Sequence, residues 1–244
     1  MEICVDSVAS AKNAQKAGAK RVELCCNLME GGTTPSLGLF RMVKEKICIP
    51  VYVMIRPRGG DFLYDDNEFM TMRYEIEVFK QYHADGFVFG ILSSDGTVDK
   101  TRNKELIDLC KPSPITFHRA FDVVGDGSTA LEDLINLGFD RVLTSGLEAT
   151  ALEGLPNLIQ LVKQAGERII IVPGGGITEK NVERIMSQCQ AKEFHGSARV
   201  SNKSKMDFQR GDIHMGAALY PPEYSIKVSS QERIQEFINI VRKI

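Results

Sequence analysis

The sequence predicts a single (β/α)8 TIM barrel that spans residues 1–244, and three observations lead to this fold. Short runs rich in β-branched residues alternate with longer segments of helical periodicity, eight times in order. The length of 244 residues is close to the roughly 250 residues of a typical barrel of this kind. A motif also recurs, because "AGAKRVELC" at residues 17–25 and "LGFDRVLTSG" at residues 137–146 both pass from a helix end through glycine into a strand.

Each expected strand is a run of four or five residues. In chain order the runs are EICV (2–5), RVELC (21–25), VYVMI (51–55), GFVFG (86–90), ITFH (115–118), RVLTS (141–145), RIIIV (168–172) and EFHGS (193–197). An open doubly wound sheet is the alternative. It usually has fewer strands, and no G-x-G-x-x-G motif joins the first strand to the first helix here.

Helical periodicity is clearest in two of the segments between strands. An apolar stripe, with Asp65 and Glu68 as a capping pair at its start, is formed by Phe69, Met72, Ile76 and Phe79. The last helix has Ser229 and Glu232 as its expected cap, followed by the apolar stripe Ile234, Phe237, Ile238 and Val241. Before it, residues 199–227 form an irregular segment too long for an ordinary strand-to-helix loop. We expect this segment to cover the barrel mouth or to contact another subunit.

Composition excludes several classes of protein. A net charge of -2 argues against a general nucleic-acid binder, which is usually basic. No window approaches the roughly 18 apolar residues of a membrane span, and no secretory signal precedes the first strand. The six cysteines lack C-x-x-C spacing, so neither a disulfide framework nor a zinc finger is indicated. We therefore expect a cytoplasmic protein, with the nucleus as a second location.

Strand parity places a polar set of side chains in the barrel lumen. Residues two apart in a strand share a face, and apolar alternates such as Ile3 and Val5 should pack outward against the helices. The expected inward residues are Glu2, Cys4, Glu23, Cys25, Met54, Arg56 and His118. A buried charge needs a partner, so we expect Arg56 to pair with Glu23 or Glu2.

Two candidate sites follow at the carboxyl ends of the strands, where barrel enzymes carry their chemistry. An anion site would combine arginines with the backbone of "PGGGIT", near a helix expected to begin at about Thr178. Its residues are Arg56, Arg58, Gly174, Gly175, Gly176 and Ser197. An acid/base site would use Glu23 and His118 to move protons, with Arg56 holding a phosphate- or carboxylate-bearing metabolite. The glycine run is equally compatible with a tight turn, and His118 with a purely structural hydrogen bond.

Several longer segments together resemble the CutC copper homeostasis family. They are EICVDS, RVELC, GGTTPS, VMIRPRGGDF, TFHRAFD, RVLTSG, PGGGIT and EFHGSAR, and the C-terminal EYSIKV resembles the animal branch. The resemblance implies a TIM barrel, a homo-oligomer (dimer or tetramer), a role in copper handling and Cu(I) as the bound ion. The family's proposed ligands fall on Cys4 and Cys25. Soft thiolates suit Cu(I), although small buried core residues are the alternative for both cysteines.

The resemblance brings no accepted reaction, so enzyme activity stays open. Three functions remain: a Cu(I)-binding protein, an enzyme for a small anionic metabolite at the barrel mouth, and an interaction scaffold. The first two are compatible with each other. The density of ionisable residues at the strand ends disfavours the third.

Overall fold

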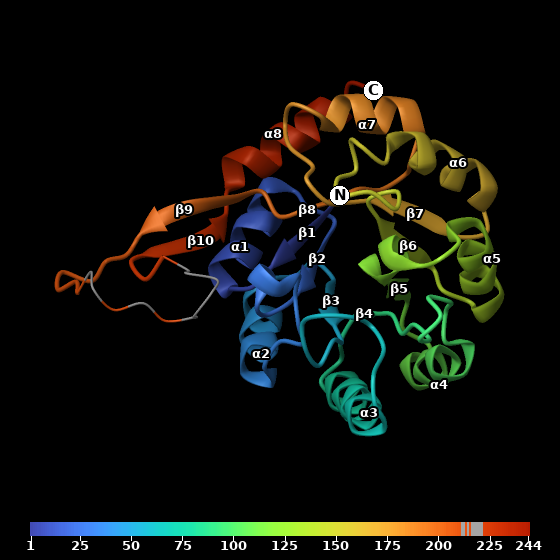
Figure 1. Cartoon of the computed structure of the whole chain (residues 1–244). Coiled ribbons are helices and arrows are strands. Elements are labelled where there is room, and N and C mark those ends of the chain that lie inside the picture. The colour runs from blue at the N-terminus through green and yellow to red at the C-terminus, as the bar shows by residue number, and fades with distance from the viewer. Residues whose placement is uncertain (211–212, 214, 216–221) are drawn as a thin grey trace.

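Eight short parallel strands curl into a nearly closed barrel at the centre of the molecule (Figure 1). The computed structural model describes residues 1–210, 213, 215 and 222–244. The strands are β1 (Glu2–Val5), β2 (Arg21–Leu24), β3 (Val51–Met54), β4 (Gly86–Phe89), β5 (Ile115–Phe117), β6 (Arg141–Thr144), β7 (Ile170–Pro173) and β8 (His195–Gly196). Their order is β7-β6-β5-β4-β3-β2-β1-β8, so β1 to β7 pair with their neighbours in sequence and β8 pairs with β1, while no ladder joins β7 to β8 among the described residues. The predicted barrel and its eight strands are confirmed.

Helices surround the barrel and cover the outer face of the sheet (Figure 1). They are α1 (Val8–Ala17), α2 (Leu37–Lys46), α3 (Asp66–Gln81), α4 (Lys100–Cys110), α5 (Gly127–Leu137), α6 (Leu155–Ala165), α7 (Val182–Cys189) and α8 (Gln231–Val241), with the 3-10 turns η1 (Leu28–Glu30) and η2 (Arg119–Val123). The capping box of Asp65 and Glu68 begins α3 as predicted. The cap of α8 is Ser230 rather than Ser229, because the Ser230 hydroxyl accepts the Arg233 N–H while Ser229 ends strand β10 (Ser225–Ser229).

Strand parity divides the interior into two apolar regions, as expected. The outward side chains of β1 and β2, such as Ile3, Val5 and Leu24, belong to the main core between sheet and helices. A second, smaller cluster fills the lumen and consists of Cys4, Cys25, Tyr52, Met54 and Val88. The lumen is therefore a packed interior that changes into a polar pocket toward the carboxyl ends of the strands.

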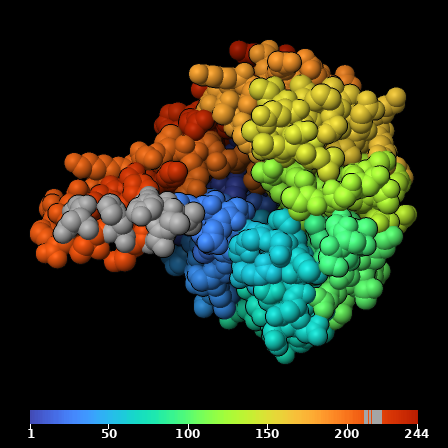
Figure 2. All heavy atoms as spheres, viewed as in Figure 1, coloured from blue at the N-terminus to red at the C-terminus, as the bar shows by residue number. Residues whose placement is uncertain are grey.

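Residues 199–227 are more regular than the sequence indicated. Strand β9 (Arg199–Lys203) pairs with β10 in an antiparallel ladder, from Arg199 opposite Ser229 to Lys203 opposite Ser225. This hairpin, which we call the arm, projects from the rounded body of the barrel (Figures 1 and 2). The described part of residues 199–227 therefore does not cover the barrel mouth, and residues 211–212, 214 and 216–221 lie outside the described residues. Polar side chains on both faces hid the alternation from which a strand is usually predicted.

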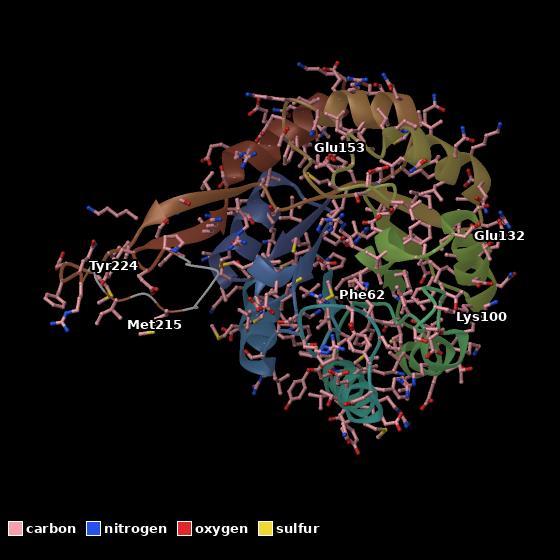
Figure 3. All side chains as sticks on the ribbon, in the orientation of Figure 1. Phe62, Lys100, Glu132, Glu153, Met215 and Tyr224 are labelled. Carbon is pink, nitrogen blue, oxygen red and sulfur yellow. The ribbon has the colours of Figure 1, made fainter. Side chains whose placement is uncertain are left out.

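Side chains at the arm and the barrel rim have different surroundings (Figure 3). The Tyr224 hydroxyl accepts the Arg210 N–H and donates to the Arg210 carbonyl, which fixes part of the arm. Phe62 lies near the barrel centre, whereas Lys100 and Glu132 lie at the periphery (Figure 3).

Among the described residues, no helix is both long and apolar enough to cross a bilayer.

Candidate functional site

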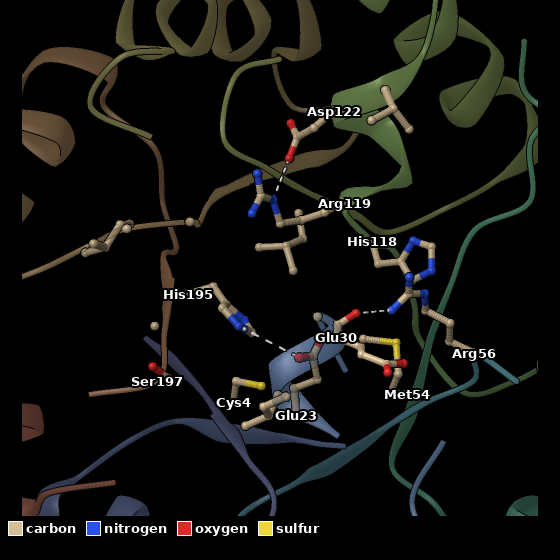
Figure 4. Close-up of a pocket in the computed structure, with 18 of the residues that line it drawn as sticks. Cys4, Glu23, Glu30, Met54, Arg56, His118, Arg119, Asp122, His195 and Ser197 are labelled. Atoms are coloured by element: carbon tan, nitrogen blue, oxygen red, sulfur yellow. Dashed lines mark hydrogen bonds and ion pairs between the residues drawn. The ribbon is translucent and has the colours of Figure 1, made fainter. Parts of the chain in front are cut away.

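A pocket of about 620 Å³ opens at the carboxyl ends of the strands (Figure 4). It collects side chains from β1, β2, β3, β6 and β8 and from the loops that follow the strands. The sequence-predicted residues that line it are Cys4, Glu23, Met54, Arg56, His118, Gly175, Gly176 and Ser197. Its size suits a small metabolite. Five of the seven predicted lumen residues therefore share one cavity, although they come from distant parts of the chain, while Glu2 and Cys25 do not line it.

The two cysteines at the floor of the pocket face each other. Cys4 Sγ lies 3.7 Å from Cys25 Sγ, and Cys25 Sγ lies 3.4 Å from Glu23 Oε2. β1 and β2 pair with Cys4 opposite Glu23, and Cys25 follows directly after β2. The inward parity of both strands is what brings the two sulfurs together. Cys4 lines the pocket, whereas Cys25 is fully buried behind it.

The two thiols differ in acidity. The Cys25 hydrogen bond lowers the pKa of Cys4 to about 6, against the effect of burial and with help from His195. The same hydrogen bond and burial raise the pKa of Cys25 well above its ordinary value. The pair therefore shares one proton at neutral pH, with the thiolate on the pocket side.

A charged network lies below the sulfur pair. Glu2 Oε1 is 2.7 Å from His195 Nδ1, and Glu2 Oε2 accepts Arg21 Nε at 2.5 Å. Burial favours protonated Glu2, but His195 and Arg21 hold its pKa at about 2. Burial also opposes the charge of His195, yet Glu23, Cys4 and Glu2 raise the pKa of His195 well above its ordinary value. An imidazolium therefore lies between the Glu2 carboxylate and the Cys4 thiolate.

Glu23 joins this network to the pocket. Its Oε2 is 3.8 Å from His195 Nε2, while its buried Oε1 has no hydrogen-bond partner among the described residues. Burial raises the pKa of Glu23 well above its ordinary value. A carboxyl group with a raised pKa and a free oxygen toward a pocket can exchange a proton with a bound molecule.

His118 is held as a neutral donor on the other side of the pocket. Its Nδ1 accepts the Ala120 N–H at 3.3 Å, so the proton resides on Nε2, which has no partner among the described residues. Burial, together with the nearby charge of Arg56, lowers the pKa of His118 to about 3. The ring packs against Phe62 at an interplanar angle of 57°, with centroids 4.9 Å apart.

The predicted pairing of Arg56 with Glu23 or Glu2 is wrong. Arg56 instead donates to three backbone carbonyls, those of Glu30, Gly32 and Gly60, at 2.7–2.9 Å. The glycine-rich turns around it direct these carbonyls inward, while Arg21 and His195 satisfy Glu2. The lumen thus pairs its charges along the seam between β1, β2 and β8.

The structure brings only some residues of the expected anion site to the pocket. Arg58 is not among the residues that line the pocket, and it binds Glu68 at 2.5 Å and Asp61 at 3.0 Å. Gly174 packs against Leu143 and His195 behind the pocket wall. Gly175, Gly176 and Ser197 do line the cavity. The helix expected near Thr178 begins at Val182, because a turn fixed by Asn181 comes first.

Several polar residues that line the pocket were placed at the strand ends but not assigned to a site from the sequence, among them His195, Arg119 and Asp122. Arg119 donates through Nε to Asp122 at 2.7 Å and through Nη2 to Ser145 at 2.7 Å. His195 could have been identified from register, because it lies opposite the inward-facing Glu2 once β8 closes onto β1. Arg119 and Asp122 offered no signal besides their place after the fifth strand.

Two groups of side chains among the described residues have spacing suited to a metal ion. Cys4, Glu23 and Cys25 form one, and Glu2, Glu23 and His195 the other, each with ligand atoms within 4.8 Å of one another. The first group offers two sulfurs and one oxygen. The second already uses Glu2 and His195 in a hydrogen bond, which leaves it less able to take an ion.

Comparisons with known proteins show a family match over most of the chain. The model of the CutC family matches residues 1–200. Two relatives named copper homeostasis protein cutC homolog match all of this chain. The one from Mus musculus is 53% identical, and the match covers 90% of its length. The one from Homo sapiens is 52% identical, and the match covers 89% of its length. A solved CutC structure from Streptococcus agalactiae has a TM-score of 0.75 and 37% identity, and the match covers 80% of this chain and 97% of that one.

Proposed function

This chain belongs to the CutC family, and from that premise we propose that it binds Cu(I) through the thiolates of Cys4 and Cys25 as part of copper homeostasis. The observation that carries this proposal is the 3.7 Å separation of the two sulfurs at the pocket floor. The copper homeostasis name of the mammalian relatives supports the choice of ion.

The donor set fits a soft ion. Cu(I) prefers thiolate ligands, and the two sulfurs lie beside the apolar side chains of Met54 and Val88. Cys4 reaches the pocket and provides the entry side, while buried Cys25 completes the pair. An ion that replaces the shared thiol proton also balances the negative charge of the buried thiolate.

Anaerobic titration with Cu(I) tests the proposal. Wild type should bind one equivalent at the pair, and Cys4→Ser and Cys25→Ser should each lose it. Cys26→Ser is the matched control, because Cys26 is adjacent in sequence but belongs to a β-bridge with Thr33 outside the lumen cluster. Unchanged stoichiometry in both lumen variants would eliminate these ligands.

A second candidate function is an enzyme acting on a small anionic metabolite in the same pocket. The observation that favours it is the pair of unpartnered buried atoms, Glu23 Oε1 and His118 Nε2, in a cavity of about 620 Å³. Glu23 would move the proton and His118 would donate a hydrogen bond to a substrate oxygen, with Arg56 organising the surrounding turns. Thermal-shift screening of phosphorylated and carboxylic metabolites tests this function. A ligand that stabilises wild type but neither Glu23→Gln nor His118→Gln would support it.

The cellular setting and assembly also belong to the proposal. Six free cysteines suit a reducing compartment, so the expected location is the cytoplasm, with the nucleus as a second one. The chain forms a homo-oligomer, a dimer or a tetramer, and the exposed Met206 and Phe208 of the arm support association. Light scattering on the purified protein would contradict this if it gave the mass of one chain.

A further inference from the structure

We propose that the barrel mouth carries a phosphate subsite formed by Arg119 and the backbone of Gly175 and Gly176. The ligand is a small phosphorylated molecule, so the inference rests on the second candidate function and names its anion-binding residues. This subsite replaces the two arginines expected from the sequence, since backbone carbonyls bind both terminal nitrogens of Arg56 and carboxylates bind Arg58.

Arg119 has one free donor nitrogen at the mouth. Its Nε binds Asp122 and its Nη2 binds Ser145, which orients the guanidinium. No described residue accepts a hydrogen bond from Nη1. A Cβ added to Gly175 would lie 3.2 Å from this nitrogen, so Nη1 lies directly beside the glycine turn. The fixed fork of arginine suits a phosphate oxygen.

The glycine turn adds backbone donors at the same place. Gly175 and Gly176 have φ values of 95° and 69°, and none of the described residues accepts a hydrogen bond from either N–H. The turn is nevertheless fixed, because Gly174 N–H donates to Thr144 and Gly175 C=O accepts from Ala151, both at 2.9 Å. Successive free N–H groups in a turn can form an anion-binding concavity, and barrels of this class often hold phosphate after strands seven and eight.

The nearby Asp122 carboxylate does not cancel this site. Besides Arg119, it accepts hydrogen bonds from the Thr144 hydroxyl at 2.5 Å and from the N–H groups of Ser145 and Leu147 at 2.9 and 3.2 Å. These donors stabilise its negative charge. Figure 4 shows Arg119 and Asp122 on one side of the cavity, apart from Arg56 and His118.

Deeper polar atoms point to a ligand larger than the phosphate itself. His118 is almost fully buried, lines the pocket, and offers an Nε2–H with no described partner. Glu23 also lines the pocket, and its buried Oε1 has no hydrogen-bond partner among the described residues. A phosphate at Arg119 would leave the rest of the ligand to contact these two groups, and the cavity of about 620 Å³ holds both parts.

Direct binding of inorganic phosphate tests the subsite without assuming a reaction. Calorimetry and ³¹P line broadening in a phosphate-free buffer should detect saturable binding to wild type. Arg119→Gln should weaken it at least about tenfold, as expected for the loss of a charge-assisted hydrogen bond. Arg119→Lys should retain part of the affinity. Arg58→Gln is the matched control, because it removes a mouth arginine that the carboxylates of Glu68 and Asp61 engage, and it should bind like wild type.

Each outcome decides the inference. No saturable phosphate binding to wild type overturns it, as does equal weakening by Arg119→Gln and Arg58→Gln. Cu(I) stoichiometry is measured on the same Arg119→Gln preparation and should be unchanged, which also shows that the variant is folded. A failed phosphate titration beside an intact copper site would therefore refute the subsite alone.

Discussion

Glu2 Oε1 lies 2.7 Å from His195 Nδ1 and thereby joins the first strand of the barrel to the last. The other oxygen of Glu2 binds Arg21, and Arg21 also binds Glu193 at the base of the lumen. The seam where the barrel closes has only a short backbone ladder, since β8 contributes two residues. Buried side-chain pairing therefore supplements the hydrogen bonds at this junction.

Glu2→Gln should destabilise the protein by about 3 kcal/mol at pH 7, because it leaves two buried cations short of a partner. The pKa of Glu2 is about 2 in the folded protein against an ordinary 4.5. The stabilisation is thus complete above about pH 4.5 and is lost as the pH falls toward 2. Urea unfolding should show the same difference in unfolding free energy between wild type and variant at pH 7 and 5, and a smaller difference at pH 3.5.

Glu132→Gln is the control for this prediction. Glu132 pairs with Arg168 at 2.7 Å and its pKa is also lowered to about 2, but the pair is exposed at the periphery (Figure 3). Solvent screening leaves such a pair with little effect on stability. An equal loss of unfolding free energy in Glu2→Gln and Glu132→Gln would contradict the stabilising role of the buried Glu2 carboxylate. A loss in Glu2→Gln that does not depend on pH would contradict it too.

His118 should remain neutral across the physiological range. Its pKa is about 3 in the folded chain, against an ordinary 6.5, so histidine resonances recorded from pH 8 to 5 should show no titration for this ring. Its ¹⁵N spectrum should show the Nε2–H tautomer, because Nδ1 accepts the Ala120 N–H. The unfolded chain takes up a proton below about pH 6.5, so this group also lowers stability as the pH falls toward 3. A midpoint near 6.5 would refute the buried neutral imidazole.

The barrel itself could be predicted from local patterns. Eight β-branched runs, each followed by a helical stripe, leave few ways to bury both strand faces. Parity also placed Cys4, Glu23, Met54 and His118 in one lumen, because a strand fixes which face each residue occupies. The arm could not be predicted in the same way, since β9 and β10 bury little and show no apolar alternation.

The hydrogen-bond partners of the pocket residues could not be predicted from the sequence. Parity says that Arg56 points inward, but the carbonyls of Glu30, Gly32 and Gly60 that bind it are directed by turn conformation. His195 pairs with Glu2 because of the register between strands 193 residues apart in the chain. Such pairings depend on barrel closure, and a sequence read strand by strand does not contain that information.

Gly86→Ala should destabilise the lumen by about 1–3 kcal/mol through overpacking. An added Cβ would lie 2.6 Å from the ring of Tyr52, which is itself held under the guanidinium groups of Arg21 and Arg141. The ring therefore has little freedom to move away. Chemical denaturation of Gly86→Ala, Tyr52→Leu and the double variant should show a double-variant loss smaller than the sum of the two single losses. Strict additivity would contradict the contact.

Glu23→Gln should affect the binding of Cu(I) and Zn²⁺ at the sulfur pair differently. Cys4, Cys25 and Glu23 place two sulfurs and a carboxylate oxygen within 4.8 Å of one another. Cu(I) depends on soft thiolates, whereas Zn²⁺ accepts carboxylate oxygen as a regular ligand. We therefore expect Cu(I) to bind the variant with unchanged stoichiometry, while Zn²⁺ binding weakens at least about tenfold, as for the loss of a ligand or its close support.

Competition titrations with chromophoric chelators measure both ions on the same preparation. Glu30→Gln is the matched control, since Glu30 is a carboxylate that lines the same pocket but lies outside the metal-spaced group. It should leave both affinities unchanged. If Glu23→Gln weakened Cu(I) as strongly as Zn²⁺, the oxygen would have to act as a full ligand to copper. The site would then require three donors rather than two thiolates, and the soft two-sulfur description of the pocket floor would be wrong.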